Sequence, residues 1–151
     1  DRFMLRLHVG YPSLADERQI LRDRERTNPL DTVEPVMSEE DVLELQKRAG
    51  GVRVDEVLVD YLLQIVAQTR EADSIELGVS PRGTLSLFRS AQALALVEGR
   101  DFCIADDVKR LVMPCFAHRI IVSSRYANVT RRTHEAEHLL QEILLKTKVP
   151  V

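Results

Sequence analysis

Residues 77–82, Leu-Gly-Val-Ser-Pro-Arg, stand directly before a long apolar run and predict the start of a helix. Ser80 has the short polar side chain that caps helices, and Pro81 follows at the first helical position, where a missing N–H is harmless. Arg82 then lies in the first turn, at the positive end of the helix dipole, where a cation is unfavourable by about 1 kcal/mol. Residues that break such local rules are enriched at functional sites. In this case, free backbone amides and a guanidinium at one helix start could bind a phosphate group. The open alternative is an ion pair between Arg82 and a carboxylate on another helix.

The apolar residues on either side of this stretch recur at helical spacing, which predicts a mainly α fold of five or six helices. Residues 52–54 and 102–104 are β-rich triplets, and we expect them to pair as a minimal two-stranded ribbon, since their amides would otherwise lack partners. Residues 3–9 alternate between apolar and polar side chains and predict a strand, whereas residues 120–132 have no clear period and predict a loop. Helix starts are expected at Ser13, Ser38, Asp55, Ser80, Asp106 and Thr133. The residues expected to be buried together are Leu58, Leu62, Ile65, Leu85, Phe88 and Leu94.

The composition favours a folded domain that does not bind nucleic acid. The 151 residues are 44% hydrophobic, enough for one ordinary core, and the net charge of −3 with both signs interspersed provides no basic surface. No apolar run approaches the roughly 18 residues of a membrane span, so no membrane contact is expected. Cys103 and Cys115 have no metal-ligand spacing, and we interpret them as buried small hydrophobes of a cytoplasmic protein. Without an initial methionine, the chain is interpreted as a fragment of a longer protein or as a processed chain.

Two other patterns have a chemical and a structural interpretation. Residues 134–138 spell H-E-x-x-H, which on a helix can hold zinc between two imidazoles, but a third ligand is missing and Glu142 lies on the same helix. We therefore expect no metal site and interpret His134 and His138 as part of an exposed charged face. The pair Asp106-Asp107 could hold Mg²⁺ or act in acid–base chemistry, but acidic residues in a first helical turn are explained more simply by helix capping.

A resemblance to a known family follows from these residues. Residues 77–82 with the helix behind them, then Gly99-Arg100-Asp101, an apolar triplet and Asp106-Asp107-Val108, resemble the lid of MoxR-type AAA+ ATPases. The family more often has alanine at Gly83 and a capping threonine or serine at Ala105. The resemblance implies three parts: residues 1–12 as a remnant of the AAA+ core with its last strand, residues 13–37 as a connecting helix and linker, and residues 38–151 as the helical lid domain.

The same resemblance implies roles for individual residues. Arg82 corresponds to the sensor-2 arginine, which reaches the nucleotide of its own subunit, and Arg2 is the candidate arginine finger, which reaches the nucleotide of the next subunit. Ser80, Pro81 and Arg82 are the implied nucleotide-binding residues. The implied cofactors are ATP and Mg in the full-length parent, and the implied partners are neighbouring subunits of a ring oligomer and proteins with von Willebrand A domains.

The implied work is chaperone-like remodelling or metal-cofactor insertion driven by ATP hydrolysis. No Gly-Lys pair occurs, so a P-loop is absent and the chain alone is not expected to hydrolyse ATP. The competing hypothesis is a non-enzymatic helical module that binds another protein.

Overall fold

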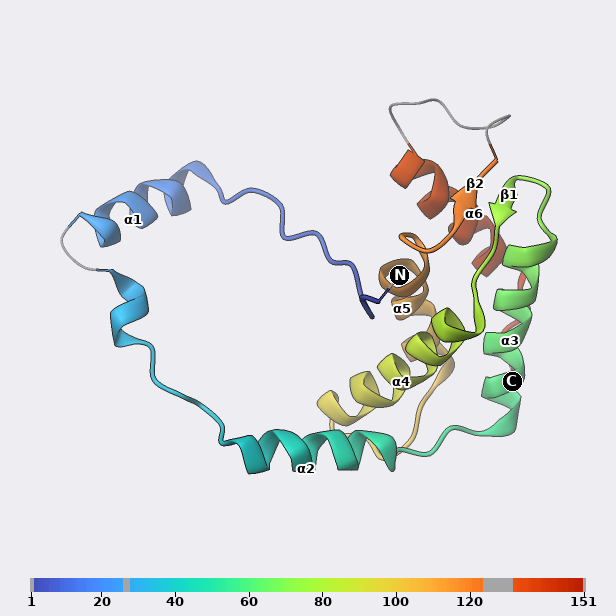
Figure 1. Ribbon diagram of the computed structural model, residues 1–151, viewed down its shortest axis with the longest axis horizontal. Helices are drawn as coiled ribbons and strands as arrows, with labels where there is room; N and C mark the ends of the chain where they lie inside the picture. Colours follow the sequence, from blue (N-terminus) through green and yellow to red (C-terminus); the bar gives the residue numbers. More distant parts are fainter. Residues whose placement is uncertain (1, 26–27, 124–131, 151) are drawn as a thin grey trace. The chain divides into compact units, whose positions relative to one another are not determined.

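The computed structural model describes residues 2–25, 28–123 and 132–150. The chain divides into two compact units, one of residues 1–6 with 45–151 and one of residues 7–44. Helices dominate both units, so the predicted mainly α fold is confirmed (Figure 1). The elements are α1 (Leu14–Arg24), the 3-10 turn η1 (Pro29–Thr32), α2 (Glu39–Gly50), α3 (Glu56–Glu71), β1 (Ile75–Leu77), α4 (Pro81–Val97), α5 (Ala105–Phe116), β2 (Ile121–Val122) and α6 (Arg132–Lys146).

The starts of α1 and α2 follow the serine caps that the sequence predicts, whereas Asp55 precedes α3 without a side-chain cap hydrogen bond, and α5 and α6 each begin one residue before the predicted Asp106 and Thr133. Before α1, Ser13 Oγ accepts the Asp16 N–H at 3.3 Å, and the Asp16 carboxylate accepts the Ser13 N–H at 3.2 Å. Before α2, Ser38 and Asp41 form the same reciprocal pair at 3.1 and 2.9 Å. The hydrogen bonds from Ser13 and Ser38 hold the pKa values of Asp16 and Asp41 below their ordinary range, because they favour the charged carboxylates. These caps satisfy amides that the first helical turns leave unpaired.

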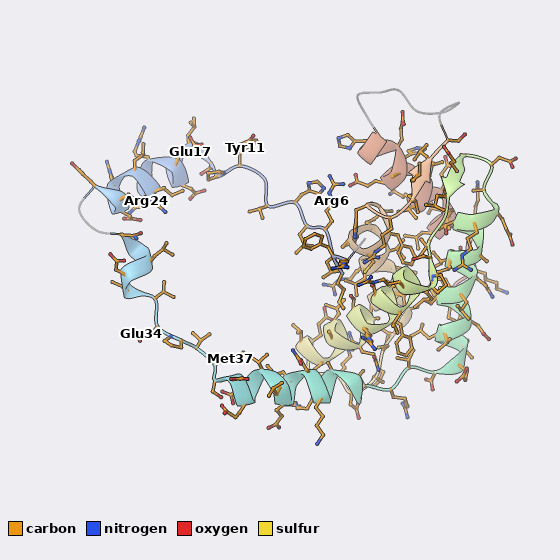
Figure 2. The ribbon with its side chains drawn as sticks, in the orientation of Figure 1. Arg6, Tyr11, Glu17, Arg24, Glu34 and Met37 are labelled. Carbon is orange, nitrogen blue, oxygen red and sulfur yellow. The ribbon has the colours of Figure 1, made fainter. Side chains whose placement is uncertain are left out.

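The unit of residues 7–44 has no buried residue in its described part (Figure 2, with Tyr11, Glu17 and Arg24 labelled). Residues 3–9, whose alternation predicts a strand, have no strand pairing with any described residue. Alternation gives a segment two faces but supplies no neighbouring strand to accept its amides. Instead the segment's Arg6 N–H donates to the Pro114 carbonyl of α5 at 2.9 Å.

The core of the larger unit lies between α3, α4, α5 and α6. Leu58, Leu62 and Ile65 are buried, as predicted, and Phe88 is half-buried against the same cluster. The prediction for Leu85 is wrong, since this side chain is 46% exposed, and Leu94 is only half-buried. The buried face of α4 consists mainly of small residues, with Leu87 as its one large apolar side chain, and this face lies against α5, so Leu85 and Leu94 turn outward. Buried on α4 are Gly83, Ser86, Leu87, Ser90, Ala91, Gln92 and Ala95.

The two-stranded ribbon is antiparallel and joins β1 to β2, with Ile75 opposite Val122 (Figure 1). The predicted loop over residues 120–132 is therefore wrong at 121–122, and 124–131 lies outside the described residues. The predicted pairing of residues 52–54 with 102–104 is confirmed as one parallel bridge between Arg53 and Phe102. The bridge consists of Arg53 N–H to the Asp101 carbonyl and Cys103 N–H to the Arg53 carbonyl, both at 2.9 Å. Strands of two or three residues are too short to leave a periodic signal.

Asp107 secures the start of α5. Its carboxylate, 1% exposed, accepts the Ile104 N–H at 2.9 Å and both ends of the Arg100 guanidinium at 2.6 and 2.8 Å. Burial raises the pKa of this carboxyl, but the hydrogen bonds from Arg100 and Ile104 outweigh it, so the pKa lies below its ordinary value. The capping interpretation is confirmed for Asp107, while exposed Asp106 pairs with Lys109 at 3.2 Å. Cys103 is buried, as predicted, and burial raises the pKa of its thiol to about 11.

Candidate functional site

The start of α4, where sequence reasoning placed the site, is fastened to the last turn of α3 through Val79. The Thr69 hydroxyl donates to the Val66 carbonyl at 2.7 Å and accepts the Val79 N–H at 3.1 Å. Arg70 Nε donates to the Val79 carbonyl at 2.8 Å. Thr69 and Val79 are 0% and 1% exposed. Because the backbone N–H and the carbonyl of Val79 are both hydrogen-bonded to α3, this residue, which directly precedes the helix cap, has a fixed position.

Gly78 allows this close approach of the two segments. A β-carbon at residue 78 would lie 2.6 Å from the Thr69 carbonyl oxygen and 2.8 Å from the Arg70 Cα. Both are backbone atoms, which cannot move aside as the end of a flexible side chain can. The glycine of the Leu-Gly-Val-Ser-Pro-Arg stretch is therefore required by packing against α3.

The cap itself forms as predicted from the sequence. Ser80 is extended, at φ −75° and ψ 163°, and its Oγ accepts the Gly83 N–H at 3.4 Å, while Pro81 begins the helix. Pro81 has no N–H, so the Arg82 amide is the first-turn donor that remains without a partner among the described residues. The Arg82 side chain is exposed, and no carboxylate in the described ranges pairs with it. One residue thus presents an amide and a guanidinium at the helix start.

Arg119, just after α5, lies on the inner side of the same helix start, and sequence reasoning did not find it. Its Nε donates to the Cys115 carbonyl at 2.9 Å, and its Nη2 donates to Ser86 Oγ at 3.3 Å and to the Phe3 carbonyl. A β-carbon added to Gly83 would lie 3.3 Å from the Arg119 Cδ and 2.7 Å from the Val79 Cγ1. The family difference at Gly83 therefore has a structural reason: the missing methyl leaves room for these two side chains. Neither Arg119 nor Thr69 belongs to a recognisable motif.

Arg2, the second predicted arginine, is exposed at the beginning of the described chain. Its neighbour Phe3 is bound through its backbone, since the Phe3 carbonyl also lies 3.3 Å from His118 Nε2. Burial lowers the pKa of His118, because it disfavours the charged imidazolium. No hydrogen bond joins Arg82 to Arg2 in the described part of the structure, but Arg119 bonds both to Ser86 on the helix of Arg82 and to the Phe3 carbonyl next to Arg2.

The two histidines of the H-E-x-x-H motif are exposed, as predicted, whereas Glu135 is half-buried. The side chains of His134 and His138 are 84% and 72% exposed, and their Nδ1 atoms lie 3.7 and 3.5 Å from Glu137 and Glu142 on the same helix. Among the described residues no group of three or more His, Cys, Asp or Glu could hold a metal ion. The described helices also include none that is both long and apolar enough to cross a membrane.

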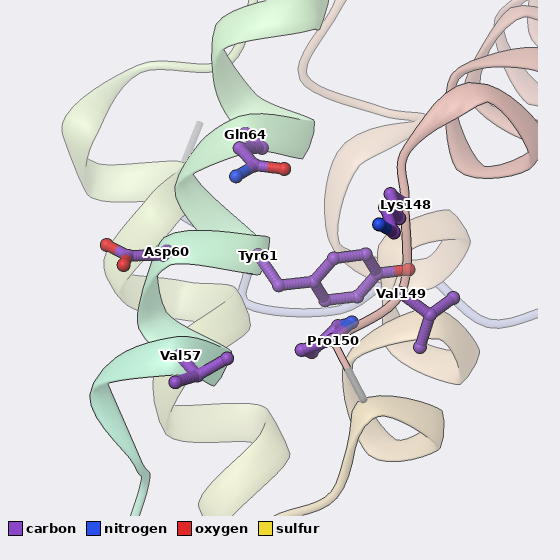
Figure 3. Close-up of a pocket in the computed structure, with 7 residues that line it drawn as sticks. All are labelled: Val57, Asp60, Tyr61, Gln64, Lys148, Val149 and Pro150. Atoms are coloured by element: carbon purple, nitrogen blue, oxygen red, sulfur yellow. The ribbon is translucent and has the colours of Figure 1, made fainter.

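A separate pocket of about 400 Å³ lies between α3 and the C-terminal residues (Figure 3). The Tyr61 ring points from α3 toward this segment, and its hydroxyl is buried without a hydrogen-bond partner in the described structure. The lining is Val57, Asp60, Tyr61, Gln64, Lys148, Val149 and Pro150. It shares no residue with the start of α4.

Residues 67–143, which contain the α3 anchor, the helix start and Arg119, match the AAA lid domain family. The chain belongs to this family. The chain is 38% identical to the uncharacterized protein YeaC of Bacillus subtilis over 153 residues, covering 100% of this chain and 46% of that protein. It is 34% identical to the chaperone MoxR1 of Mycobacterium tuberculosis over 132 residues, covering 82% of this chain and 34% of MoxR1.

The crystal structure of a presumed ATPase from Cytophaga hutchinsonii superposes on this chain with a TM-score of 0.81 and 27% sequence identity. The alignment covers 99% of this chain and 47% of that one. The predicted resemblance to the lid of MoxR-type AAA+ proteins is therefore confirmed. The chain spans about half the length, or less, of these relatives, so the lid accounts for only part of such a protein.

Proposed function

We propose that Arg82 acts as the sensor-2 arginine of this lid, which reports the nucleotide of its own subunit in a MoxR-type AAA+ ATPase. One observation carries the proposal: an exposed arginine without an ion pair among the described residues stands on a helix start that α3 holds in place. The structural arginines Arg70 and Arg119 donate from their side chains to backbone carbonyls, whereas a sensor must stay available to an anionic ligand.

The family implies ATP with Mg as the cofactors, and the residues at the start of α4 fit the phosphate end of this ligand. Ser80 and Pro81 orient the first turn, the Arg82 amide can donate to a phosphate oxygen, and the guanidinium can hold negative charge. Bound ATP supplies the phosphoryl group that is hydrolysed. The chain has no P-loop, so we propose that the lid alone is inactive and that the remaining ligands come from a nucleotide-binding core.

The wider roles extend the same proposal. Arg2 would serve as the arginine finger toward the neighbouring subunit of a ring, with residues 1–12 ending the core, residues 13–37 connecting and residues 38–151 closing over the nucleotide. We also propose a cytoplasmic setting and chaperone-like remodelling or metal-cofactor insertion with partners that carry von Willebrand A domains. The name of MoxR1, a chaperone, supports this direction.

The test compares Arg82→Ala with the control Arg89→Ala in the lid alone and in a protein that joins this lid to its core. Arg89 is an exposed arginine on the same helix, so the control removes a like charge away from the helix start. We expect Arg82→Ala to change the free energy of unfolding of the lid by less than about 0.5 kcal/mol. The same change should lower the kcat of ATP hydrolysis about 10- to 1000-fold, as the loss of other preorganised charge stabilisers does. A large loss of lid stability with ordinary ATPase activity would contradict the proposal and favour a structural or protein-binding role.

A further inference from the structure

A continuous set of hydrogen bonds links the helix turn that carries Arg82 to the backbone next to Arg2. The Ser86 hydroxyl donates to the Arg82 carbonyl at 3.0 Å. The same oxygen accepts Arg119 Nη2 at 3.3 Å, and this Nη2 also donates to the Phe3 carbonyl. A single guanidinium nitrogen therefore contacts both the first turns of α4 and the N-terminal segment.

The end of α5 is built to hold that segment. Ala117 N–H donates to Met113, and Arg119 and Ile120 N–H both donate to Phe116, so the carbonyls of Pro114 and Cys115 receive no helical bond from these residues. The Pro114 carbonyl accepts the Arg6 N–H at 2.9 Å, and the Cys115 carbonyl accepts Arg119 Nε at 2.9 Å. The second bond fixes the orientation of the guanidinium, which then reaches both of its other acceptors.

Packing leaves Arg119 little freedom to change place. The side chain is only partly exposed, and its aliphatic part fills the space that Gly83 leaves beside the buried Val79. A lysine at this position would keep the charge and most of the aliphatic length but has one nitrogen instead of a planar fork, so it cannot satisfy Cys115, Ser86 and Phe3 together. The geometry is specific to arginine.

We propose that Arg119 is a positioning residue that couples α4 to residues 3–6, so that a displacement of the Arg82 turn is passed to the segment that follows Arg2. The proposal rests on the function proposed for Arg82 and Arg2. It adds a physical connection between the element that senses the nucleotide of one subunit and the element that reaches the next. The connection runs through Ser86 and Arg119 and ends at the Phe3 carbonyl.

The first experiment measures hydrogen exchange of the Arg6 amide by NMR in the 151-residue chain. Arg119→Lys should speed this exchange about 10-fold or more, because charge-assisted hydrogen bonds that hold the segment are lost. Arg89→Lys on the outer face of α4 is the matched control and should change nothing. Ser86→Ala touches neither Phe3 nor Arg6, yet it should also speed the exchange, by about 2-fold or more, because Arg119 loses its anchor on α4.

The outcomes separate the coupling from the function on which it rests. Unchanged Arg6 exchange in both Arg119→Lys and Ser86→Ala overturns the coupling, whatever the ATPase activity is. If Arg119→Lys unfolds the chain, the Ser86→Ala result alone decides: faster Arg6 exchange supports the coupling and unchanged exchange overturns it.

The second experiment measures ATPase kinetics in the protein that joins the lid to its core. Arg119→Lys should lower kcat with little change in KM, and combining it with Arg82→Ala should slow hydrolysis no further than Arg82→Ala alone. If Arg82→Ala lowers kcat but Arg119→Lys does not, the coupling is overturned while the sensor role stands. If Arg82→Ala leaves kcat unchanged, the sensor role fails, and the exchange data still decide whether the two segments are coupled.

Discussion

Gly78 offers the sharpest test of how the helix start is positioned. In Gly78→Ala the new methyl carbon would lie 2.6 Å from the Thr69 carbonyl oxygen and 2.8 Å from the Arg70 Cα. Relieving the overlap requires the segment before α4 to move away from the last turn of α3. That movement lengthens the two hydrogen bonds that Thr69 and Arg70 make with Val79, now 3.1 and 2.8 Å.

The expected loss follows from these contacts. Overpacking against atoms that cannot relax costs about 1–3 kcal/mol, and each of the two hydrogen bonds contributes about 1 kcal/mol. The lower entropy of an unfolded chain with alanine offsets about 0.4–1 kcal/mol. Gly78→Ala should therefore lower the free energy of unfolding by about 2–4 kcal/mol, which for a domain of this size lowers Tm by roughly 4–16 °C.

Urea denaturation followed by circular dichroism measures this loss, and two other glycines serve as matched controls. A β-carbon on Gly50, the last residue of α2, meets nothing within 4 Å, so Gly50→Ala should be neutral or stabilise by up to about 1 kcal/mol through helix propensity. A β-carbon on Gly83 meets only side-chain atoms, at 2.7 Å for Val79 Cγ1, so a clash of about 1–3 kcal/mol less about 1 kcal/mol of helix propensity should leave a net loss of about 0–2 kcal/mol, smaller than for Gly78→Ala. If Gly78→Ala unfolds within about 0.5 kcal/mol of the parent, the close-approach argument is refuted.

Three further predictions concern other parts of the lid. Asp107→Asn removes the charge-assisted hydrogen bonds to Arg100, which keeps Glu98 and the Phe102 carbonyl as partners, and should cost about 1–3 kcal/mol at pH 7, as urea denaturation would measure. The pKa of Asp107 in the folded protein lies below the ordinary 3.8, so the carboxylate stabilises the fold above that pH and this contribution is lost as the pH falls through the folded value. The free energies of unfolding of the parent and of Asp107→Asn should therefore converge in acid, and a difference that stays constant with pH would contradict this. Tyr61→Phe removes a buried hydroxyl without a partner among the described residues and should be neutral or stabilise by about 1–3 kcal/mol in thermal melts; a clear loss of stability would mean that the hydroxyl is hydrogen-bonded. Zinc should not survive dialysis against a chelator at the exposed His134 and His138, and stoichiometric retention measured by metal analysis would overturn that expectation.

Local chemistry explains what the sequence predicted correctly. Ser13, Ser38 and Ser80 mark helix starts because a hydroxyl accepts an amide within its own first turn, an interaction that needs no distant residue. Gly99 ends α4 with φ +76°, a conformation that glycine adopts without strain. The candidate site was found in the same way, because the conflict between Arg82 and the helix dipole lies within a few consecutive residues.

Contacts between distant segments explain what could not be predicted. The alternation of residues 3–9 predicts a strand, but none of the described strands pairs with them, and the Pro114 carbonyl accepts the Arg6 amide instead. Leu85 has the spacing of a core residue, yet the face of α4 that lies against α5 consists mainly of small residues, so 46% of Leu85 remains exposed. Periodicity names the apolar positions of a helix but does not tell which of two adjacent faces a neighbouring helix will cover.

The sequence by itself determined the helices, their caps and the arginine that carries the proposed function, since each depends on residues within about one turn of one another. The tertiary structure decided how that arginine is held. Thr69 is 10 residues from Val79 and Arg119 is 33 residues from Ser86 along the chain, and no spacing rule relates either pair. Their hydrogen bonds form because the packed apolar core brings α3, α4 and the end of α5 together, and burial then makes it costly to leave the polar groups of Thr69, Val79 and Arg119 without partners.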